Sequence, residues 1–479
     1  MRNLTMLTDL YQLTMMYGYH KTGQTRSTAV FDMFYRQQSD EMNFAIFAGL
    51  EQLIDYIRDL HFGEQDLAYL RSLKLFDEDF LKALGELRFT GDLYAVPEGT
   101  VVFPHEPIVR VCGPIMDCQL IETALLNCVN FETLIATKAA RVCQAAQAPV
   151  AEFGLRRAQG AAGGLWASRA AVVGGCASTS NVLAGKLFGI PVSGTHAHSW
   201  VMSFSDEISA FRAYAEAFPK NCILLVDTYD VAQGVRNAIT VGLEMRARGE
   251  RLAGIRIDSG DLAWLAKMAR RMLDEAGLSD CGIVLSNDLD EFTIQSIRDE
   301  GAQVMSWGVG TKLACAYDQP TLGGVYKLSA TREPGEREWT DRLKISESVG
   351  KLTTPGVLDV RRYFYCDNGR LAGDMVFDVN APGDQSREVI VDPADDLRQK
   401  NLAGLCSKTL LEPLARDGRT VLDAAGRDAQ AARARAQEGL ALLDESQKRM
   451  LNPHTYPVGL EYGLFERRRE LVARMRGIA

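Results

Sequence analysis

Apolar runs of strand length alternate with amphipathic stretches across residues 222–311. The apolar runs are nearly continuous, a pattern typical of parallel strands whose two faces are covered by helices. Short turns marked by glycine separate one unit from the next. We therefore expect repeated strand–helix units in this segment. The expected strands are 222–227, 252–258, 282–288 and 302–311, and the expected helices are 231–248, 262–275 and a stretch that ends at Glu300.

The two ends of the chain show a different pattern. Residues 91–114 are strand-rich with proline and glycine turns, and residues 119–148 have the pattern of a long helix. Beyond residue 345, strand patterns at 361–365 and 389–391 accompany a charged helical stretch at 428–443. We expect an α/β protein in which both ends build a second domain. The expected boundaries are 1–140, 141–345 and 346–479.

Composition narrows the class of protein. The chain has 479 residues, a length that predicts two or three domains, and its formal charge of −9 argues against a dedicated nucleic-acid binder. We expect no membrane span, because no apolar stretch reaches the length that a bilayer requires, and the first residues lack the pattern of a signal peptide. The expected location is the cytoplasm. The ten scattered cysteines form no CxxC motif, so we expect reduced thiols rather than a zinc site.

Polar residues gather where each expected strand of the central segment ends. Because the carboxyl ends of parallel strands meet at one edge of a sheet or barrel, these clusters predict a functional site there. The alternative is that Asp258, Ser259 and Asp288 merely cap the helices that follow. Capping explains any single residue well, but it explains four clusters in register less easily. The clusters are 227–230, 256–261, 286–288 and 308–311.

A long stretch without acidic residues lies between Glu152 and Asp206. It carries four basic residues and is rich in glycine, serine and threonine, so backbone amides and hydroxyls there could hold a phosphate. The alternative is a buried segment of small residues packed between elements. We favour the anion site. The basic residues are Arg156, Arg157, Arg169 and Lys186.

Two of the six histidines form the pair His196 and His198. Such a pair at a strand end could bind a metal, as in barrel metallohydrolases, but those enzymes need further histidines on later strands. After His198 the chain has only His454, far beyond the expected barrel units. A metallohydrolase is therefore disfavoured. For His196, a structural role and a functional one stay equally open.

Seven motifs, in this order, resemble the nicotinate phosphoribosyltransferase family. The likeness covers residues 5 to about 465, and although each motif alone is modest, the full series is highly specific. The resemblance implies an irregular TIM-like α/β barrel with an α/β sandwich domain built from the N- and C-terminal parts. The motifs are TDLYQLTM (8–15), EFGLRRAQG (152–160), GTHAHSW (194–200), LLVDTYD (224–230), IRIDSGDL (255–262), WGVGT (307–311) and NPHTYPVGL (452–460).

The resemblance also implies an activity. The family transfers phosphoribose from phosphoribosyl pyrophosphate to nicotinate, yielding nicotinate mononucleotide for NAD synthesis. ATP is a co-substrate hydrolysed through a phosphohistidine, and Mg²⁺ is required without direct protein ligands. The family further implies a head-to-tail homodimer with shared active sites, and no nucleic-acid or membrane partner.

Individual roles follow residue by residue from the matched motifs. The pyridine ring is expected between Tyr11, reaching in from a partner subunit, and Phe153. Arg256 is expected to pair with the substrate carboxylate, since a guanidinium matches a carboxylate well. The implied substrate-binding residues are Tyr11, Phe153, Arg156, Thr195, Arg256, Gly310 and Thr311, and the implied catalytic residues are His198, which takes the phosphate, and Asp258.

Three rival functions were weighed against this one. The sibling enzyme for nicotinamide carries an acid in the loop matching residues 174–181, where this sequence has none, and an acid there would repel a carboxylate. A quinolinate enzyme would be shorter and more basic. A non-catalytic phosphate-binding barrel is a rival from another class, and it is disfavoured because every residue that turnover would need is present.

Overall fold

The computed structural model divides the chain into two compact units. Residues 135–320 form the central unit, and residues 1–134 together with 321–479 form the terminal unit. The division falls within the long helix α6 (Glu122–Ala146). The structure describes residues 3–36, 42–346, 352–380, 388–421 and 427–478.

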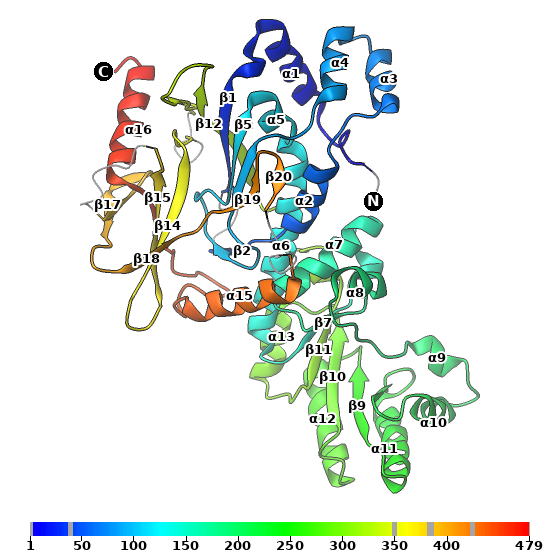
Figure 1. The fold of residues 1–479 in the computed structure, drawn as a ribbon. Helices are drawn as coiled ribbons and strands as arrows, with labels where there is room; N and C mark the ends of the chain where they lie inside the picture. Colours follow the sequence, from blue (N-terminus) through cyan, green and yellow to red (C-terminus); the bar gives the residue numbers. More distant parts are fainter. Residues whose placement is uncertain (1–2, 37–41, 347–351, 381–387, 422–426, 479) are drawn as a thin grey trace. The chain divides into compact units, whose positions relative to one another are not determined.

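A six-stranded sheet forms the core of the central unit (Figure 1). All of its pairings are parallel, and the last strand, β11, pairs with the first, β6, so the sheet is curled. An isolated parallel bridge joins Thr179 to Val192 beyond β7. In sheet order the strands are β7 (Ser178–Thr179), β6 (Val150–Glu152), β11 (Ser306–Val309), β10 (Gly282–Asn287), β9 (Leu252–Ile257) and β8 (Cys222–Leu225).

Helices connect these strands, as the hydrophobic pattern predicts. Helix α12 spans Leu262–Glu275, the expected bounds, while α11 (Val231–Ala247) and α13 (Glu291–Asp299) each end one residue early. Strand β11 begins four residues later than expected, because Gly301, at φ 83°, ends α13 in a left-handed turn. The other helices of this unit are η2 (Leu155–Arg157), α7 (Gly160–Val173), α8 (Val182–Phe188), α9 (His198–Met202), α10 (Glu207–Ala217) and α14 (Thr311–Ala314).

The terminal unit contains two larger sheets and a two-stranded one, β2 (Ala45–Ile46) with β4 (Val101–Val102). The first large sheet is antiparallel, in the order β13 (Thr340–Asp341), β12 (Gly324–Arg332), β1 (Thr28–Tyr35), β5 (Val109–Pro114), β3 (Asp92–Ala95), β19 (Glu412–Arg416), β20 (Arg419–Thr420). The second has the order β17 (Asp395–Asn401), β16 (Val389–Asp392), β21 (Val458–Glu461), β15 (Leu371–Asp378), β14 (Leu358–Phe364), β18 (Cys406–Thr409).

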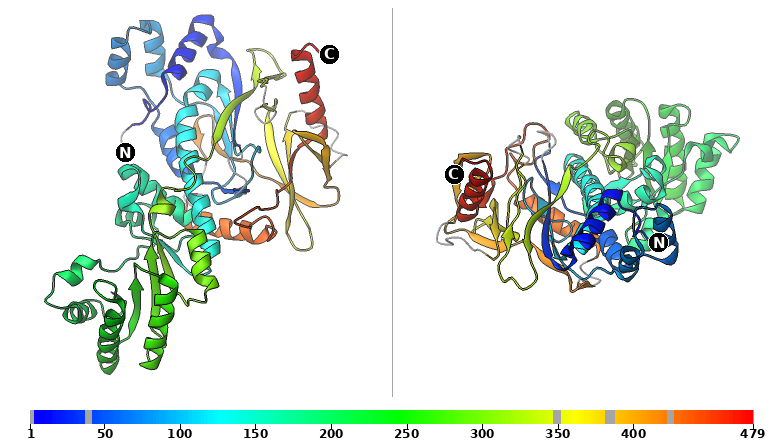
Figure 2. Two further views of the ribbon diagram at one scale, coloured as in Figure 1. Left: turned by 180° about the vertical axis from the view of Figure 1, so that it is seen from behind. Right: turned by 90° about the horizontal axis from the view of Figure 1, so that it is seen from above.

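Both chain ends contribute to these sheets, and helices cover them. The C-terminal helix α16 (Tyr462–Met475) packs on β16 and β21 (Figure 2). The mixed α/β class expected from the sequence is thus confirmed. The remaining helices of the unit are α1 (Leu10–Thr22), η1 (Gln24–Arg26), α2 (Leu50–Asp59), α3 (Glu64–Ser72), α4 (Glu78–Glu86), α5 (Ile115–Leu120) and α15 (Ala429–Leu442).

Strand β12 belongs to the terminal unit, although the sequence boundary at 345 placed it with the barrel. Its backbone pairs with β1 over the whole length of both strands, from Thr28 opposite Arg332 to Tyr35 opposite Gly324. This eight-residue backbone pairing with β1 places β12 in the terminal unit, although β12 follows the central unit directly in the sequence. The structural division therefore comes at residue 321.

Two cysteines depart from the expectation of reduced thiols. Cys366 and Cys406 form a disulfide at the paired ends of β14 and β18. The remaining eight cysteines are free. The antiparallel pairing of Phe364 with Cys406 brings the two sulfurs within bonding reach, which scattered spacing in the sequence could not reveal. Among the described helices, none combines the length and apolarity that a bilayer crossing requires.

A buried charge network joins β14 and β15. The Arg362 guanidinium donates to both carboxylate oxygens of Asp374, and the hydroxyl of Tyr456 donates to Asp374 as well. Arg362 also donates to the carbonyl of Val101, and its guanidinium lies over the ring of Phe103. Arg362 and Asp374 are both almost fully buried. Glu106, also buried, lies 3.6 Å from Arg362, so Asp374 is the nearer of the two carboxylates that compensate the guanidinium.

Replacing Asp374→Ala should destabilise the terminal unit strongly, because the buried Arg362 charge would lose its hydrogen-bonded carboxylate and keep only Glu106, 3.6 Å away. We expect a loss of about 3–5 kcal/mol in the free energy of unfolding. Chemical denaturation followed by circular dichroism would measure it. Asp396→Ala, at an exposed position of β17, is the matched control and should change little. Equal stability of the two variants would contradict the assignment.

Candidate active site

A cavity of about 360 Å³ opens at the carboxyl ends of the parallel strands in the central unit. Its walls come from the segments that follow β6, β9, β10 and β11, and from residues 194–197. The polar clusters expected at these strand ends therefore converge. The lining residues are Phe153, Arg156, Arg157, Ser180, Gly194, Thr195, His196, Ala197, Arg256, Asp258, Ser286, Asn287, Asp288, Gly308, Gly310 and Thr311.

The structure brings together most of the site residues that the sequence predicts. His198 lies next to the cavity, at the start of α9. Tyr11 lies on α1 in the terminal unit and is 48% exposed, so its expected role across a subunit boundary stays a prediction. The predicted residues that line the cavity are Phe153, Arg156, Thr195, Arg256, Asp258, Gly310 and Thr311.

Arg256 presents an unused donor to this cavity. One of its terminal nitrogens donates to the carbonyl of His196 at 2.6 Å, whereas its buried Nε–H has no acceptor among the described residues. Burial lowers the pKa of Arg256, while the nearby carboxylates of Asp258 and Asp227 raise it. A buried cation with a free N–H is costly to keep in a protein. The arrangement favours an anionic ligand beside Arg256.

An aromatic wall stands opposite the β11 backbone. A Cβ atom added at Gly308 would lie 2.6 Å from Cε2 of Phe153, so only glycine allows the ring to lie this close. Position 308 therefore sets the place of the Phe153 ring. A flat ligand ring could pack on the exposed side of the ring.

Two carboxylates and an imidazole form a cluster at the edge of the cavity. Oδ2 of Asp227 accepts hydrogen bonds from the backbone N–H of Asp258 at 2.9 Å and from Oγ of Ser259 at 2.7 Å. Nε2 of His198 lies 3.9 Å from Asp227 and 3.8 Å from Asp258, and its Nδ1 lies 3.3 Å from Oγ1 of Thr228. Asp227 and Asp258 therefore face the same imidazole nitrogen.

The capping alternative for the strand-end residues is wrong for the residues it named. The helices α11, α12 and α13 are capped by Asp230, Asp261 and Asp290, each accepting from a backbone N–H in the first turn. Asp258 instead accepts from Oγ of Ser286 at 2.6 Å, and Ser259 donates to Asp227. Separate aspartates thus serve the helices and the cavity.

Both interpretations of the acid-free stretch describe part of it. Arg156, Arg157 and Ser180 line the cavity, as an anion site requires. Thr179 and Ser168 instead donate to the buried carboxylate of Glu152, at 2.6 and 3.0 Å. These bonds fix β7 and α7 against β6. The small residues pack the segment, while two of its four basic residues, Arg156 and Arg157, line the cavity and Arg169 is buried.

His196 has a structural role that the sequence left open. Its Nε2 accepts the backbone N–H of Leu225 at 3.2 Å, on β8, the strand at the free edge of the sheet. An acceptor nitrogen must be unprotonated, and burial lowers the pKa of His196 to about 4. The imidazole therefore replaces a strand partner for β8. Because this nitrogen is occupied, the histidine pair is a poor metal site.

Several cavity residues were not singled out from the sequence. Ser286 and Asp288 line the cavity and Asp227 lies at its edge; all three belong to the strand-end clusters, and that signal could have identified them. Asn287 adopts a positive φ of 150°, which nothing in the sequence announces. Within the described ranges, no group of three or more His, Cys, Asp or Glu residues is placed to hold a metal ion.

Three family models, all of nicotinate phosphoribosyltransferase, match successive parts of the chain. Residues 6–130 match the N-terminal domain of nicotinate phosphoribosyltransferase, residues 149–338 match the nicotinate phosphoribosyltransferase family, and residues 359–468 match its C-terminal domain. A nicotinate phosphoribosyltransferase of Bacillus subtilis is 44% identical over 96% of this chain and 93% of its own length. The human enzyme of the same name is 37% identical over 73% of this chain and 75% of its own length.

Solved structures agree with the sequence comparison. The crystal structure of human nicotinic acid phosphoribosyltransferase superposes with a TM-score of 0.84 at 32% identity, covering 97% of this chain and 99% of that one. A nicotinate-nucleotide pyrophosphorylase from Pyrococcus furiosus shares the fold, with a TM-score of 0.69 at 22% identity over 92% of this chain and 96% of that one.

The lowered pKa of His196 predicts a pH effect on stability. The folded protein keeps His196 neutral down to about pH 4, whereas the unfolded chain takes up a proton near its ordinary value of 6.5. The stabilisation is therefore complete above pH 6.5 and is lost as the pH falls toward 4, by up to about 1.4 kcal/mol per pH unit. Thermal unfolding between pH 7 and pH 4 would measure the loss.

The variant His196→Leu lacks this proton linkage. We expect it to be less stable at pH 7, because Leu225 loses its acceptor, and to lose less stability on acidification than the unmodified protein. His61→Leu, an exposed histidine of the terminal unit, is the control. The same dependence on pH in all three proteins would refute the assignment.

Proposed function

This chain belongs to the nicotinate phosphoribosyltransferase family, and we propose that it joins nicotinate to phosphoribosyl pyrophosphate. The products would be nicotinate mononucleotide and pyrophosphate, a step of NAD synthesis. The observation that carries the proposal is the free Nε–H of Arg256 in a strand-end cavity beside Phe153. A planar aromatic carboxylate provides both the anion and the ring that this cavity favours.

The carboxylate substrate is preferred over its amide by charge. Ser180 is the part of loop 174–181 that lines the cavity, and this loop contains no acidic residue. Arg156 and Arg157 add positive charge to the same wall. Nicotinamide would leave these cations unneutralised.

The chemistry needs positioning rather than a general base. The lone pair of the pyridine nitrogen forms the bond to C1 of the ribose, while the C1–O bond breaks and its electrons leave with pyrophosphate. Gly310 and Thr311, where β11 gives way to α14, offer backbone N–H groups and a hydroxyl to the sugar phosphate. Holding both substrates in line supplies much of the rate enhancement.

Magnesium would enter with the pyrophosphate. The cavity fits a cation that arrives on the pyrophosphate, because Asp258, Asp288 and Asn287 provide oxygen atoms that can accept hydrogen bonds from its bound water. When bound, Mg²⁺ stabilises the charge of the departing pyrophosphate. Asp258 is held for this role by its hydrogen bond from Ser286.

ATP hydrolysis would pass through His198. Its Nε2 would attack the γ-phosphorus of ATP, the bond from that phosphorus to ADP would break, and water would later release the phosphate. The ring proton would stay on Nδ1, where Oγ1 of Thr228 lies 3.3 Å away. The carboxylates of Asp227 and Asp258 lie 3.9 and 3.8 Å from Nε2 and would stabilise the positive charge that the ring gains when Nε2 is phosphorylated. Coupling requires that the two forms of the enzyme bind substrate and product differently.

A second subunit would complete the site. Tyr11 is exposed on α1 together with Leu10 and Met15, and Leu7 is exposed just before that helix, which gives an apolar surface suited to a second copy of the chain. We infer that Tyr11 of one copy covers the pyridine ring in the other. The curled parallel sheet would then be the irregular barrel of the family.

Replacing Arg256→Ala should impair the use of nicotinate. Because a hydrogen bond to a charged group is worth about 1.5–3 kcal/mol, we expect kcat/KM for nicotinate to fall about 10- to 100-fold or more. Chromatography of the mononucleotide would measure turnover with nicotinate and with nicotinamide. Arg271→Ala, exposed on α12, should keep full activity. Preferential turnover of nicotinamide by the unmodified protein, or no turnover with either substrate, would overturn the proposed activity.

Replacing His198→Ala should separate ATP hydrolysis from transfer. We expect the variant to retain slow transfer but to lose ATP stimulation and the acid-labile phosphate that labelled ATP leaves on the protein. His196→Ala is unsuitable as a control, because that residue supports β8. His61→Ala, on the surface of the terminal unit, serves instead. Labelling that persists in His198→Ala would place the phosphate elsewhere.

A further inference from the structure

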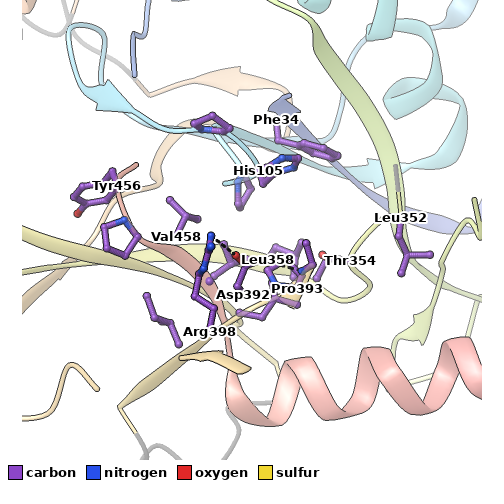
Figure 3. A pocket seen from close by; sticks show the side chains of 18 of the residues that line it. Phe34, His105, Leu352, Thr354, Leu358, Asp392, Pro393, Arg398, Tyr456 and Val458 are labelled. Atoms are coloured by element: carbon purple, nitrogen blue, oxygen red, sulfur yellow. Dashed lines mark hydrogen bonds and ion pairs between the residues drawn. The ribbon is translucent and has the colours of Figure 1, made fainter. Parts of the chain in front are cut away.

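The terminal unit contains a second cavity, larger than the one in the central unit. Its volume is about 850 Å³, and it lies between the two large sheets of that unit. Figure 3 shows Phe34 and His105 on one side, facing Leu358, Asp392 and Arg398 on the other. We call this space the inter-sheet cavity. Cavities of this size commonly hold small molecules.

Asp32 is a buried carboxylate that the protein only partly satisfies. Its side chain is 2% exposed, and Oδ2 accepts a hydrogen bond from Oγ of Ser329 at 2.6 Å. Oδ1 has no hydrogen-bond donor among the described residues, although Asp32 lines the cavity. Burial raises the pKa of Asp32 to about 7, against the hydrogen bond from Ser329. An unpartnered oxygen at this depth costs free energy that a bound donor would recover.

The basic neighbours of Asp32 across the sheet do not provide that donor. Arg110 on β5 pairs with Asp32 in register, but its guanidinium donates to the carbonyl of Leu358 at 2.7 Å and lies 3.5 Å from Asp359. Lys327 on β12 is the neighbour on the other side, yet it forms no ion pair with any described residue. Acid and base thus lie side by side on one sheet face without joining.

The charge of the cavity lining is mainly positive. Lys327, Lys400 and Arg468 all line it, and burial lowers the pKa of each, that of Arg468 to about 10. Lys400 donates to the carbonyl of Ala372, and Arg468 to that of Thr353, so neither is neutralised by an acid through these contacts. Partly buried cations without counter-ions favour an anionic ligand.

Apolar side chains complete the walls. Phe34, Leu358, Val376, Ile390 and Val458 line the cavity from both sheets. An empty cavity is stable when its lining is wholly apolar, whereas this one combines apolar walls with unpaired polar groups. The lining is therefore suited to a ligand with an apolar ring, an anionic group and a hydrogen-bond donor.

We propose that the inter-sheet cavity is a second ligand site, which binds a nucleotide. Its phosphate lies at Lys327, a hydroxyl or amino group donates to Oδ1 of Asp32, and its base packs among Phe34, Leu358 and Val458. The site belongs to the terminal unit alone and does not depend on the activity proposed for the central unit.

Isothermal titration of the full-length protein with AMP and, separately, nicotinate mononucleotide tests this site. The variants are Lys327→Met and Asp32→Asn, with Lys82→Met, exposed on α4, as the matched control. We expect Lys327→Met to weaken binding of at least one nucleotide about tenfold or more, and Asp32→Asn to weaken it as well. Lys82→Met should bind as the unmodified protein does. The nucleotide that responds identifies the base that the cavity accepts.

Arg256→Ala distinguishes the two cavities. The Arg256→Ala variant should bind the nucleotide as tightly as the unmodified protein does at the inter-sheet cavity, where Lys327→Met weakens binding. This expectation holds even if the protein proves to have no transferase activity. Unchanged affinity for both nucleotides in Lys327→Met, with the variant folded by thermal unfolding, would overturn the proposal. Equally tight binding of inorganic phosphate would overturn the nucleotide assignment, because a phosphate alone would then account for the affinity.

Discussion

The strand-end cavity depends on how the free edge of the parallel sheet is completed. Strand β11 pairs with β6, so the curled sheet is continuous from β8 round to β7 and the bridge at Val192. On its outer side, the described part of β8 pairs with no strand, and His196 accepts the N–H of Leu225 there. The carbonyl of the same residue accepts from Arg256. One residue thus completes a strand edge and positions the main cation of the site, and the segment around it brings Thr195 and His198 to the cavity.

A second constraint is that different aspartates cap the helices and face the site. Asp227 and Asp258 each precede a helix-capping aspartate, Asp230 or Asp261, by three residues. Asp230 and Asp261 cap the helices that follow. Asp227 and Asp258, three residues earlier, therefore lie at the strand ends and are free of that role. There Asp227 binds the backbone of Asp258 and links two neighbouring loops. The turns that start these helices therefore also fix the positions of the Asp227 and Asp258 carboxylates.

The sequence predicted elements well where periodicity alone decides them. The bounds of α12 match the pattern because a strand end, a capping aspartate and a closing glycine all mark it. Strand β12 was assigned to the other unit because pairing with β1, some 300 residues away, leaves no local signal. The disulfide between Cys366 and Cys406 was missed for the same reason. Motifs predicted most of the cavity lining, but the use of His196 became clear only from its contact with Leu225.

The two units show why burial alone does not mark a binding site. Glu152 is fully buried, yet the hydroxyls of Ser168 and Thr179 and the N–H of Gly154 satisfy its carboxylate, so it serves the fold. Asp32 is almost as buried but receives one hydrogen bond from a side chain, and its other oxygen has none from the described residues. Both lie within strands, Asp32 on β1 and Glu152 on β6, and burial does not distinguish them. What separates a structural carboxylate from a candidate ligand-binding one is the donor that the protein itself fails to supply.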